Sequence, residues 1–261
     1  MWRRLAFISS LILLTASCQR EEARRNQVMV AAAADLKFAL DEMAGEFQAA
    51  HPELKVRAIY GSSGNFQMQI VQGASFDLYL SADCEYPRLL VAGGDADGDS
   101  LFHYGVGALV LWVRADSPLN VEEAGMQVLL DPRVRKVAIA QPEHAPYGRA
   151  ALAALRHAGV YESVRGKLVL GENVAQAASF AESGNVDLAV IARSLALAPA
   201  LRARGRYWEI PSDHFPALLQ AGVIPKLAGN PAGAAKFSDW MRSARGRDLL
   251  MKHGFEMPTV P

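Results

Sequence analysis

The stretch VMVAAAADLKFALDEMAGEF, residues 28–47, joins two different hydrophobic patterns. Val28 to Ala33 form a short apolar run, which is typical of a buried strand. From Asp35 onward, large apolar residues recur at spacings of four, three and four: Leu36, Leu40, Met43 and Phe47. This spacing is the period of an amphipathic helix, so the stretch predicts a strand, a turn and a helix.

The same alternation continues along the chain. Strands are predicted at residues 54–60, 78–80, 107–113, 137–140, 167–170, 187–191, 207–210 and 218–224. Helices are predicted at residues 66–71, with Ser63 or Asn65 as the cap, and at 86–92, 149–158, 174–182 and 231–253. Alternating strands and helices predict an α/β fold with mostly parallel sheets, which bind ligands where strands end and helices begin.

Composition excludes several classes of protein. The 261 residues are 51% hydrophobic and 21% charged, an ordinary globular composition that allows one large domain or two small ones. Lys plus Arg and Asp plus Glu both number 27, so the formal net charge is zero. A nucleic-acid partner is therefore not expected, because no overall basic field would attract one.

The N-terminal segment predicts export. Arg3 and Arg4 precede the apolar residues 5–14, and small residues follow up to Cys18, which is the layout of a secretory signal peptide. Small residues before a cysteine resemble a bacterial lipobox, in which Cys18 would carry a lipid. Thr15 stands where that motif prefers Leu, which leaves ordinary cleavage or no cleavage as alternatives. We expect a signal peptide at residues 1–17 and a polar tether at 18–27.

Catalytic and metal-binding patterns are missing from the sequence. The six histidines form no HExxH pattern, the two cysteines form no CxxC pattern, and no phosphate-binding glycine motif occurs. Cys84 is interpreted as a packed small residue. The remaining enzymatic hypothesis is an exported hydrolase with Ser63 as nucleophile and His144 as base. We expect no enzyme activity and no cofactor.

Four strand-to-helix junctions are candidates for an anion site: Ala34-Asp35, Ser62-Ser63-Gly64, residues 145–148, and Asn173-Val174. The first turn of a helix offers unpaired backbone N–H groups and a partial positive charge. These features bind oxyanions, and serine hydroxyls add further donors. Ordinary helix capping would select the same residue types, so it remains the alternative interpretation.

Five stretches of the chain resemble motifs of one family, the molybdate-binding substrate proteins of ABC transporters. They are AAADL (residues 32–36), YGSSG (60–64), FDLYLSAD (76–83), PEHAPYG (142–148) and GENV (171–174). The motifs occur in order between residues 28 and 255. Several motifs in one order are more specific than any single one.

The resemblance implies a periplasmic-binding-protein fold with two domains, each a mixed, mostly parallel sheet flanked by helices, joined by a two-strand hinge. Residues 28–105 and 224–261 would form the first domain, and residues 106–223 the second. The protein would be a periplasmic or cell-surface monomer, anchored to the membrane through Cys18. It would capture molybdate, or tungstate, between the domains and deliver it to a transporter permease. Sulfate, phosphate or another small oxyanion is the alternative ligand.

The family's binding residues carry over to this chain with two departures. Ser63, with Ser62 beside it, would donate hydroxyls, while Tyr147 and Val174 would donate backbone N–H groups. Asp35 stands where relatives often have Ser or Asn. In addition, Ala192 replaces a tyrosine whose hydroxyl some relatives use.

An ionised Asp35 would repel a dianion, so its state has to be explained. The first explanation, which we favour, is that the carboxylate turns away as a helix cap while its backbone N–H binds the anion. The second is that the carboxyl group is protonated. The third is that Arg149 or Lys37 compensates its charge. A pocket for a different ligand is the fourth.

Overall fold

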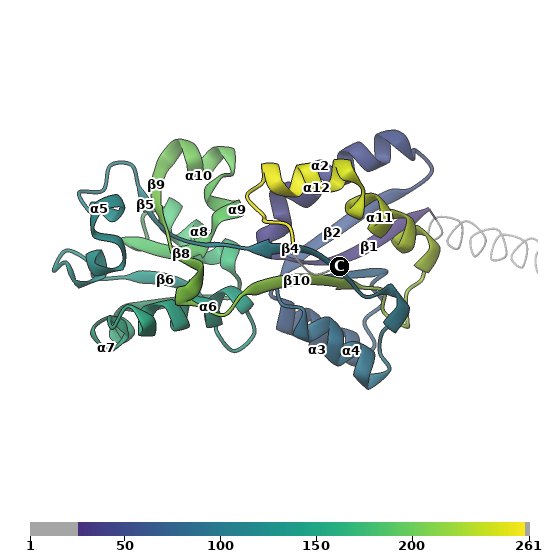
Figure 1. Cartoon of the computed structure of the whole chain (residues 1–261), viewed down its shortest axis with the longest axis horizontal. Coiled ribbons are helices and arrows are strands. Elements are labelled where there is room, and N and C mark those ends of the chain that lie inside the picture. Colours follow the sequence, from purple (N-terminus) through teal and green to yellow (C-terminus); the bar gives the residue numbers. More distant parts are fainter. Residues whose placement is uncertain (1–25, 259–261) are drawn as a thin grey trace, which may run out of the picture.

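The computed structural model describes residues 26–258, which form two lobes, each built on a five-stranded sheet (Figure 1). The predicted signal peptide, Cys18 and most of the predicted tether lie outside the described residues. The end of the tether does not: Gln27 already pairs with Lys55 in the first strand. The two sheets, each flanked by helices, confirm the predicted α/β fold class.

The first sheet has the strand order β2-β1-β3-β10-β4. Its strands are β1 (Gln27–Ala33), β2 (Lys55–Gly61), β3 (Leu78–Ser81), β4 (Phe102–Gly107) and β10 (Leu218–Val223). β1 runs parallel to β2 and β3, whereas β10 is antiparallel to β3 and β4. The predicted boundary at residue 223 assigned β10 to the second domain, but its backbone pairing places it in the first sheet.

The second sheet has the order β7-β6-β8-β5-β9. Its strands are β5 (Leu109–Arg114), β6 (Val137–Ala140), β7 (Leu168–Gly171), β8 (Leu188–Ala192) and β9 (Gly205–Glu209). β6 runs parallel to β7 and β8, and β5 is antiparallel to β8 and β9. Each sheet is therefore mixed, with a parallel half that carries the strand-to-helix junctions.

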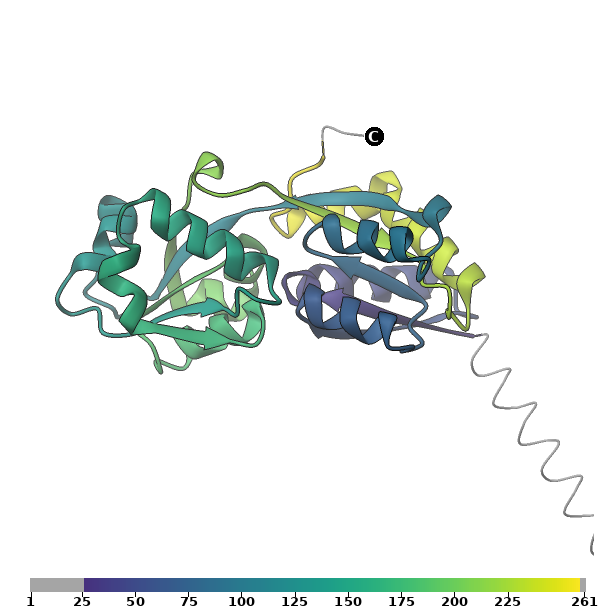
Figure 2. The same ribbon diagram turned by 90° about the horizontal axis from the view of Figure 1, so that it is seen from below.

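Two chain segments connect the lobes, one between β4 and β5 and one before β10 (Figure 2). The buried strand predicted at 107–113 is confirmed for residues 109–113, which lie in β5, but not for its first two residues. β4 ends at Gly107 in the first sheet, and β5 begins at Leu109 in the second. Between them the carbonyl of Ala108 accepts a hydrogen bond from the N–H of Arg193 instead of pairing with a strand. An apolar run does not reveal which sheet each part of it joins.

Helices cover both faces of the first sheet (Figure 1). α2 (Lys37–Ala50), α11 (Pro231–Arg242) and α12 (Ala244–Lys252) pack on one face, and α3 (Ser63–Val71) and α4 (Glu85–Gly93) on the other. The helix predicted at 231–253 is interrupted at Ser243, whose hydroxyl caps α12 by accepting the N–H of Gly246 at 3.2 Å. The spacing of apolar side chains continues across this break, so the hydrophobic pattern did not reveal that the helix is interrupted.

The second lobe contains two longer helices, α6 (Pro146–His157) and α8 (Val174–Glu182). Its shorter helices are α5 (Val121–Ala124), α7 (Tyr161–Val164), α9 (Arg193–Ala196) and α10 (Pro199–Arg204). Short 3-10 turns complete the fold: η1 (Ala34–Leu36), η2 (Gly98–Ser100), η3 (Gly125–Leu130), η4 (Arg165–Lys167) and η5 (Ser212–His214). α6 begins three residues earlier than the predicted 149, because Pro146 occupies its first turn, where proline is favoured.

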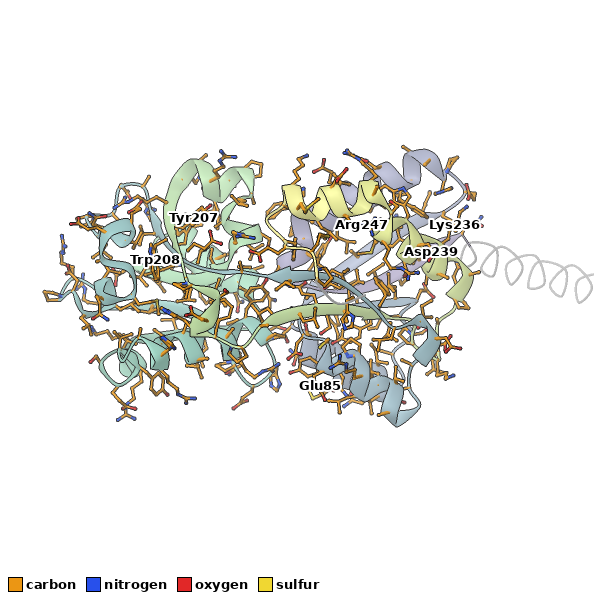
Figure 3. All side chains as sticks on the ribbon, viewed as in Figure 1. Glu85, Tyr207, Trp208, Lys236, Asp239 and Arg247 are labelled. Carbon is orange, nitrogen blue, oxygen red and sulfur yellow. The ribbon has the colours of Figure 1, made fainter. Side chains whose placement is uncertain are left out.

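Strand β9 lies at the far side of the second lobe, where Figure 3 labels Tyr207 and Trp208. The Trp208 ring lies against Gly125, at which a Cβ atom would be only 3.1 Å from the ring. Within residues 26–258, no helix is long and apolar enough to cross a membrane.

Candidate functional site

A small cavity lies where the strand-to-helix junctions of the two lobes meet. Its cavity volume is about 10 Å³, close to the roughly 10–15 Å³ that one water molecule needs and far below the roughly 300–1,000 Å³ of pockets for drug-sized ligands. Its lining residues come from both lobes: Ala33, Ala34, Asp35, Gly61, Ser62, Ser63, Ala82, Ala145, Pro146, Tyr147, Asn173 and Val174. All five residues predicted to bind the ligand are among them, although their roles remain predictions.

The sheet registers bring these junctions together. In the first sheet the last residue of β1, Ala33, lies beside the last residue of β2, Gly61. In the second sheet the last residue of β6, Ala140, lies beside the last residue of β7, Gly171. Parallel strands end at the same edge of a sheet, so four chain segments reach the cavity from two neighbouring pairs of strands.

Ser62 and Ser63 supply buried hydroxyls. Ser62 is the N-cap residue of α3, but its hydroxyl accepts no hydrogen bond from the helix. Its Oγ is buried and has no hydrogen-bond partner within the described part of the chain. Ser63 Oγ accepts the backbone N–H of Ala82 at 3.0 Å, which leaves its own proton available to a ligand. The prediction that Ser63 or Asn65 caps the helix is wrong.

The second lobe supplies backbone donors at the starts of α6 and α8. The N–H groups of Tyr147 and Val174 lie in first helical turns, where no carbonyl of a preceding turn is in reach. Asn173 caps α8 by accepting the N–H groups of Ala175 at 3.0 Å and Gln176 at 3.1 Å. This cap leaves the N–H of Val174 as the donor of that turn that can serve a ligand.

Asp35 is only 1% exposed and is held by donors from two other elements. Its Oδ2 accepts the hydroxyl of Tyr147 at 3.0 Å and the side-chain N–H of Gln220 at 2.7 Å. Its Oδ1 is buried and has no hydrogen-bond partner among residues 26–258. The favoured cap explanation is wrong, because Ala33 is the cap residue of η1 and no side chain caps that turn.

Neither of the two candidate cations among the described residues compensates the charge of Asp35. Lys37 pairs with Asp41 at 3.2 Å, and Arg149 pairs with Asp83 at 2.6 Å. Burial raises the pKa of Asp35 to about 6, although the hydrogen bonds from Gln220 and Tyr147, and the backbone N–H groups of Asp35 and Leu36, act to lower it. The cap and the compensating cation are thus not found, which leaves protonation of the carboxyl group and a pocket for a different ligand as the remaining explanations.

Sequence reasoning missed Gln220 and Gly107. Gln220 is fully buried in β10. The feature of the sequence that could have indicated it is a single amide side chain inside an apolar run. Gly107 lies against the same hydrogen-bonded group: a Cβ there would overlap the Tyr147 hydroxyl and lie 2.8 Å from Gln220 Nε2. We call Asp35, Tyr147 and Gln220, together with Ser62 and Ser63, the floor of the site.

A second set of contacts joins the lobes beside the cavity. Arg149 on α6 donates to the carboxylate of Asp83 at 2.6 Å and to the hydroxyl of Tyr86 at 2.7 Å. The N–H of Gly64 donates to the carbonyl of His144 at 2.8 Å. We call these five residues the rim of the site. No rim residue lines the cavity.

The hydrolase hypothesis gains no support from this geometry. His144 meets α3 through its backbone carbonyl, while Ser63 Oγ accepts a backbone N–H. Burial raises the pKa of the Cys84 thiol, which disfavours the nucleophilic thiolate. Within the described residues no group of three or more His, Cys, Asp or Glu side chains could hold a metal ion.

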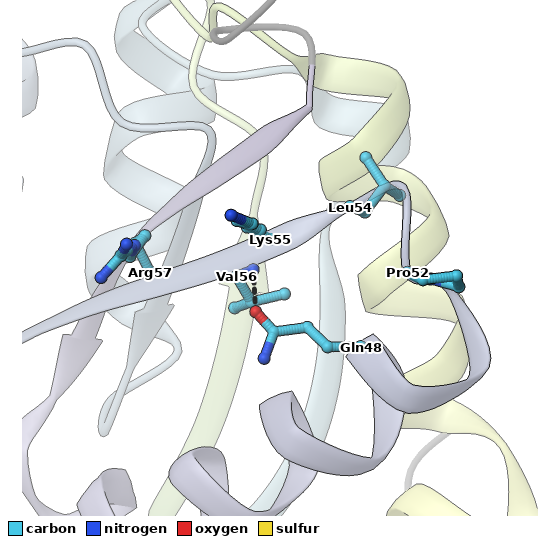
Figure 4. Close-up of a pocket in the computed structure, with 6 residues that line it drawn as sticks. All are labelled: Gln48, Pro52, Leu54, Lys55, Val56 and Arg57. Atoms are coloured by element: carbon cyan, nitrogen blue, oxygen red, sulfur yellow. Dashed lines mark hydrogen bonds between the residues drawn. The ribbon is translucent and has the colours of Figure 1, made fainter.

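A second pocket lies away from the junctions, along the edge strand β2 (Figure 4). Gln48, Pro52 and residues 54–57 line it, and Gln48 Oε1 accepts the N–H of Val56 at 2.8 Å. Lys55 and Arg57 are exposed there. This groove is separate from every residue predicted to bind the ligand.

Comparison with known proteins places the chain among binding proteins. Residues 28–256 match the family described as bacterial extracellular solute-binding protein. The chain is 37% identical to the molybdate-binding protein ModA of Rhodobacter capsulatus over 196 residues, 75% of each chain. It is 30% identical to the putative ABC transporter substrate-binding lipoprotein YvgL of Bacillus subtilis, covering 95% of this chain and 96% of that one. The solved structure of the periplasmic molybdate-binding protein of Azotobacter vinelandii superimposes with a TM-score of 0.83 at 31% identity, over 89% of this chain and 100% of that one.

Proposed function

The chain belongs to the bacterial extracellular solute-binding proteins, and from this premise we propose that it captures molybdate between its lobes and delivers it to an ABC transporter. The relatives that carry molybdate in their names support the ligand, and the ABC transporter lipoprotein supports the partner. They are transport proteins rather than enzymes, and the chain is a binding protein of the same kind.

The observation that carries the proposal is the set of neutral donors around the cavity. Two serine hydroxyls and the first-turn N–H groups of α3, α6 and α8 reach it, while none of the described lining residues is Lys or Arg. A tetrahedral dianion can be held by such donors and by the partial charges of helix N-termini. Tungstate has the same shape and charge, so we propose that it binds as well.

We further propose that the protein acts on the outer side of the cytoplasmic membrane as a monomer without a cofactor. A lipid on Cys18 would keep it near the permease. Metabolic labelling with a radioactive fatty acid tests the anchor: the wild-type protein should be labelled, and Cys18→Ser should not. An unlabelled wild-type protein would favour ordinary cleavage.

Isothermal titration of the chain without residues 1–17 tests the ligand. Molybdate and tungstate should each bind one-to-one, and sulfate and phosphate serve as the competing ligands. Ser63→Ala removes a floor hydroxyl and should weaken binding, whereas Ser75→Ala is the matched control because its hydroxyl bonds the carbonyl of Leu227 outside the cavity. Saturable binding of sulfate or phosphate with no response to either metal oxyanion would contradict the proposal.

A further inference from the structure

Asp35 presents a problem that the neutral donors around it do not. It lines the cavity and is 1% exposed, so water hardly screens its charge. An ionised carboxylate would repel a dianion bound beside it. An oxyanion can therefore bind next to Asp35 only if the carboxyl group is neutral when the ligand is present.

The hydrogen bonds of Asp35 determine where a proton would reside. Oδ2 already accepts two donors, from Tyr147 at 3.0 Å and Gln220 at 2.7 Å. A neutral carboxylic acid has one O–H donor, and its other oxygen remains an acceptor. The proton therefore belongs on Oδ1, which is buried and has no partner within residues 26–258. On Oδ1 it forms a hydrogen-bond donor that no described residue uses.

The groups around Asp35 do not offset its charge. Tyr147 on α6 and Gln220 on β10 are neutral, Tyr104 on β4 donates to the carbonyl of Ser81, and Ser194 on α9 donates to the carbonyl of Asp35 itself. The charged residues of the neighbouring helices have other partners. Lys37 on α2 pairs with Asp41, Arg149 on α6 with Asp83, and Arg193 on α9 with Glu209 and Glu256.

We propose that Asp35 binds the oxyanion as a neutral carboxylic acid, donating Oδ1–H to an anion oxygen, so that capture takes up one proton from solvent. This inference rests on the proposed function and specifies how the floor accepts a dianion. Asp35 thereby replaces the Ser or Asn donor expected at this junction. The ligand itself neither gains nor loses a proton.

The proton makes affinity depend on pH in a defined direction. Because the pKa of Asp35 is about 6 in the free protein, its carboxyl group is mostly protonated below pH 6 and mostly ionised above it. Affinity should be nearly constant below the pKa and fall toward tenfold per pH unit above it. Between pH 6 and pH 8 the loss should be about 50-fold.

Isothermal titration with molybdate in two buffers of different ionisation enthalpy counts the protons. For each molybdate bound, the wild-type protein should take up close to one proton at pH 8 and almost none at pH 5. Asp35→Asn keeps an acceptor for Tyr147 and Gln220 and offers a permanent N–H donor, so it should bind at pH 8 at least as tightly as the wild type, without proton uptake. Asp41→Asn, an exposed carboxylate paired with Lys37, should retain the uptake.

The outcomes separate this inference from the proposed function. Molybdate binding with no proton uptake by the wild type at pH 8, or affinity that rises with pH, overturns the role of Asp35 and leaves the function standing. Loss of binding in a folded Asp35→Asn protein overturns it as well. No binding of either metal oxyanion by either protein at any pH overturns the proposed function and this inference together. The wild-type proton count requires no variant to fold.

Discussion

The floor and the rim of the site both connect the lobes, but with opposite chemistry. On the floor, the buried Asp35 receives hydrogen bonds from the neutral side chains of Tyr147 and Gln220. On the rim, Asp83 remains 30% exposed and pairs with the guanidinium of Arg149. In our proposal the ligand-bound protein neutralises Asp35 with a proton, whereas Asp83 is paired with a cation.

The difference follows from what each carboxyl group faces. A buried charge is costly unless it is paired, and pairing it inside an anion site would place a fixed cation against the ligand. A partly exposed ion pair costs little and contributes little. If the site binds an anion as proposed, the floor would select it through directed donors, and the rim contacts join the lobes outside the cavity lining.

Asp35→Asn tests the floor most strongly. The folded-state pKa of about 6 lies above the ordinary value of 3.8, so the native state holds the extra proton between these values. The stability that this proton contributes is present at low pH and is lost as pH rises through about 6. The difference between 3.8 and about 6 corresponds to about 3 kcal/mol. The ligand-free variant should be more stable than the wild type by up to that amount at pH 8 and by less at pH 5.

Urea unfolding of both proteins at the two pH values measures this difference. Asp83→Asn is the rim counterpart and should show no such gain, because its carboxylate already has a cation. Equal stability of Asp35→Asn and wild type at pH 8 would show that Asp35 carries no buried charge.

Gly64→Ala tests the rim. A Cβ atom at Gly64 would lie 2.8 Å from the carbonyl oxygen of His144 and 2.9 Å from the Tyr86 hydroxyl, so the lobes could not approach as closely. Overpacking of this kind costs about 1–3 kcal/mol, which corresponds to roughly 5- to 150-fold weaker ligand binding. Gly45→Ala in helix α2 is the control, since nothing lies within 4 Å of its Cβ position.

Titration of both glycine variants with molybdate measures the effect. A Gly64→Ala protein that binds as tightly as Gly45→Ala would mean that the rim contact is not needed in the ligand-bound state. The floor would then position the ligand without it.

Local structure could be predicted from the sequence where a particular residue type marks the start or end of a helix or strand. Helix 174–182 and strand 137–140 match α8 and β6 residue for residue, and the Asn173 side chain marks the start of α8. The convergence of strand ends in parallel sheets pointed to four junctions, and the family resemblance then singled out five residues at them. All five line one cavity. The family that the motifs suggested is confirmed by the comparisons.

Contacts between distant segments could not be predicted in the same way. Gln220 reaches Asp35 from 185 residues away, through a strand that returns antiparallel to the first sheet. Arg149 reaches Asp83 across 66 residues. Periodicity carries no information about such pairings, so the cap explanation for Asp35 failed even though Asp35 lines the cavity. The break at Ala108 was missed for the same reason.

Tyr147→Phe sharpens the account of the floor. It removes one donor to Asp35 and keeps the backbone N–H that is expected to bind the ligand. Hydrogen bonds to charged groups contribute about 1.5–3 kcal/mol and those between neutral groups about 0.5–1.5 kcal/mol. The variant should therefore lose more stability at pH 8 than at pH 5, and the pKa of Asp35 should rise further. Tyr161→Phe, at a partly buried tyrosine of the second lobe outside the cavity lining, is the control. A loss that is independent of pH would indicate that the Tyr147 hydroxyl acts only through packing.

Arg149→Met should have the smallest effect and the clearest dependence on salt. Arg149 and Asp83 are 41% and 30% exposed, and exposed pairs contribute about 0.2–1 kcal/mol, so the variant should bind molybdate no more than about fivefold more weakly at low ionic strength. Because the Debye length is only about 3 Å at 1 M salt, high salt should weaken the wild-type pair and bring the two affinities together. Arg133→Met removes a similar pair with Asp131 outside the cavity lining and controls for loss of surface charge. Titrations at two concentrations of sodium chloride measure the effect.

Asp35 on the floor has no ionic partner among the described residues, so the proton uptake of the wild type should persist in high salt. If uptake and the rim contribution disappeared together, the floor and the rim would be one electrostatic unit.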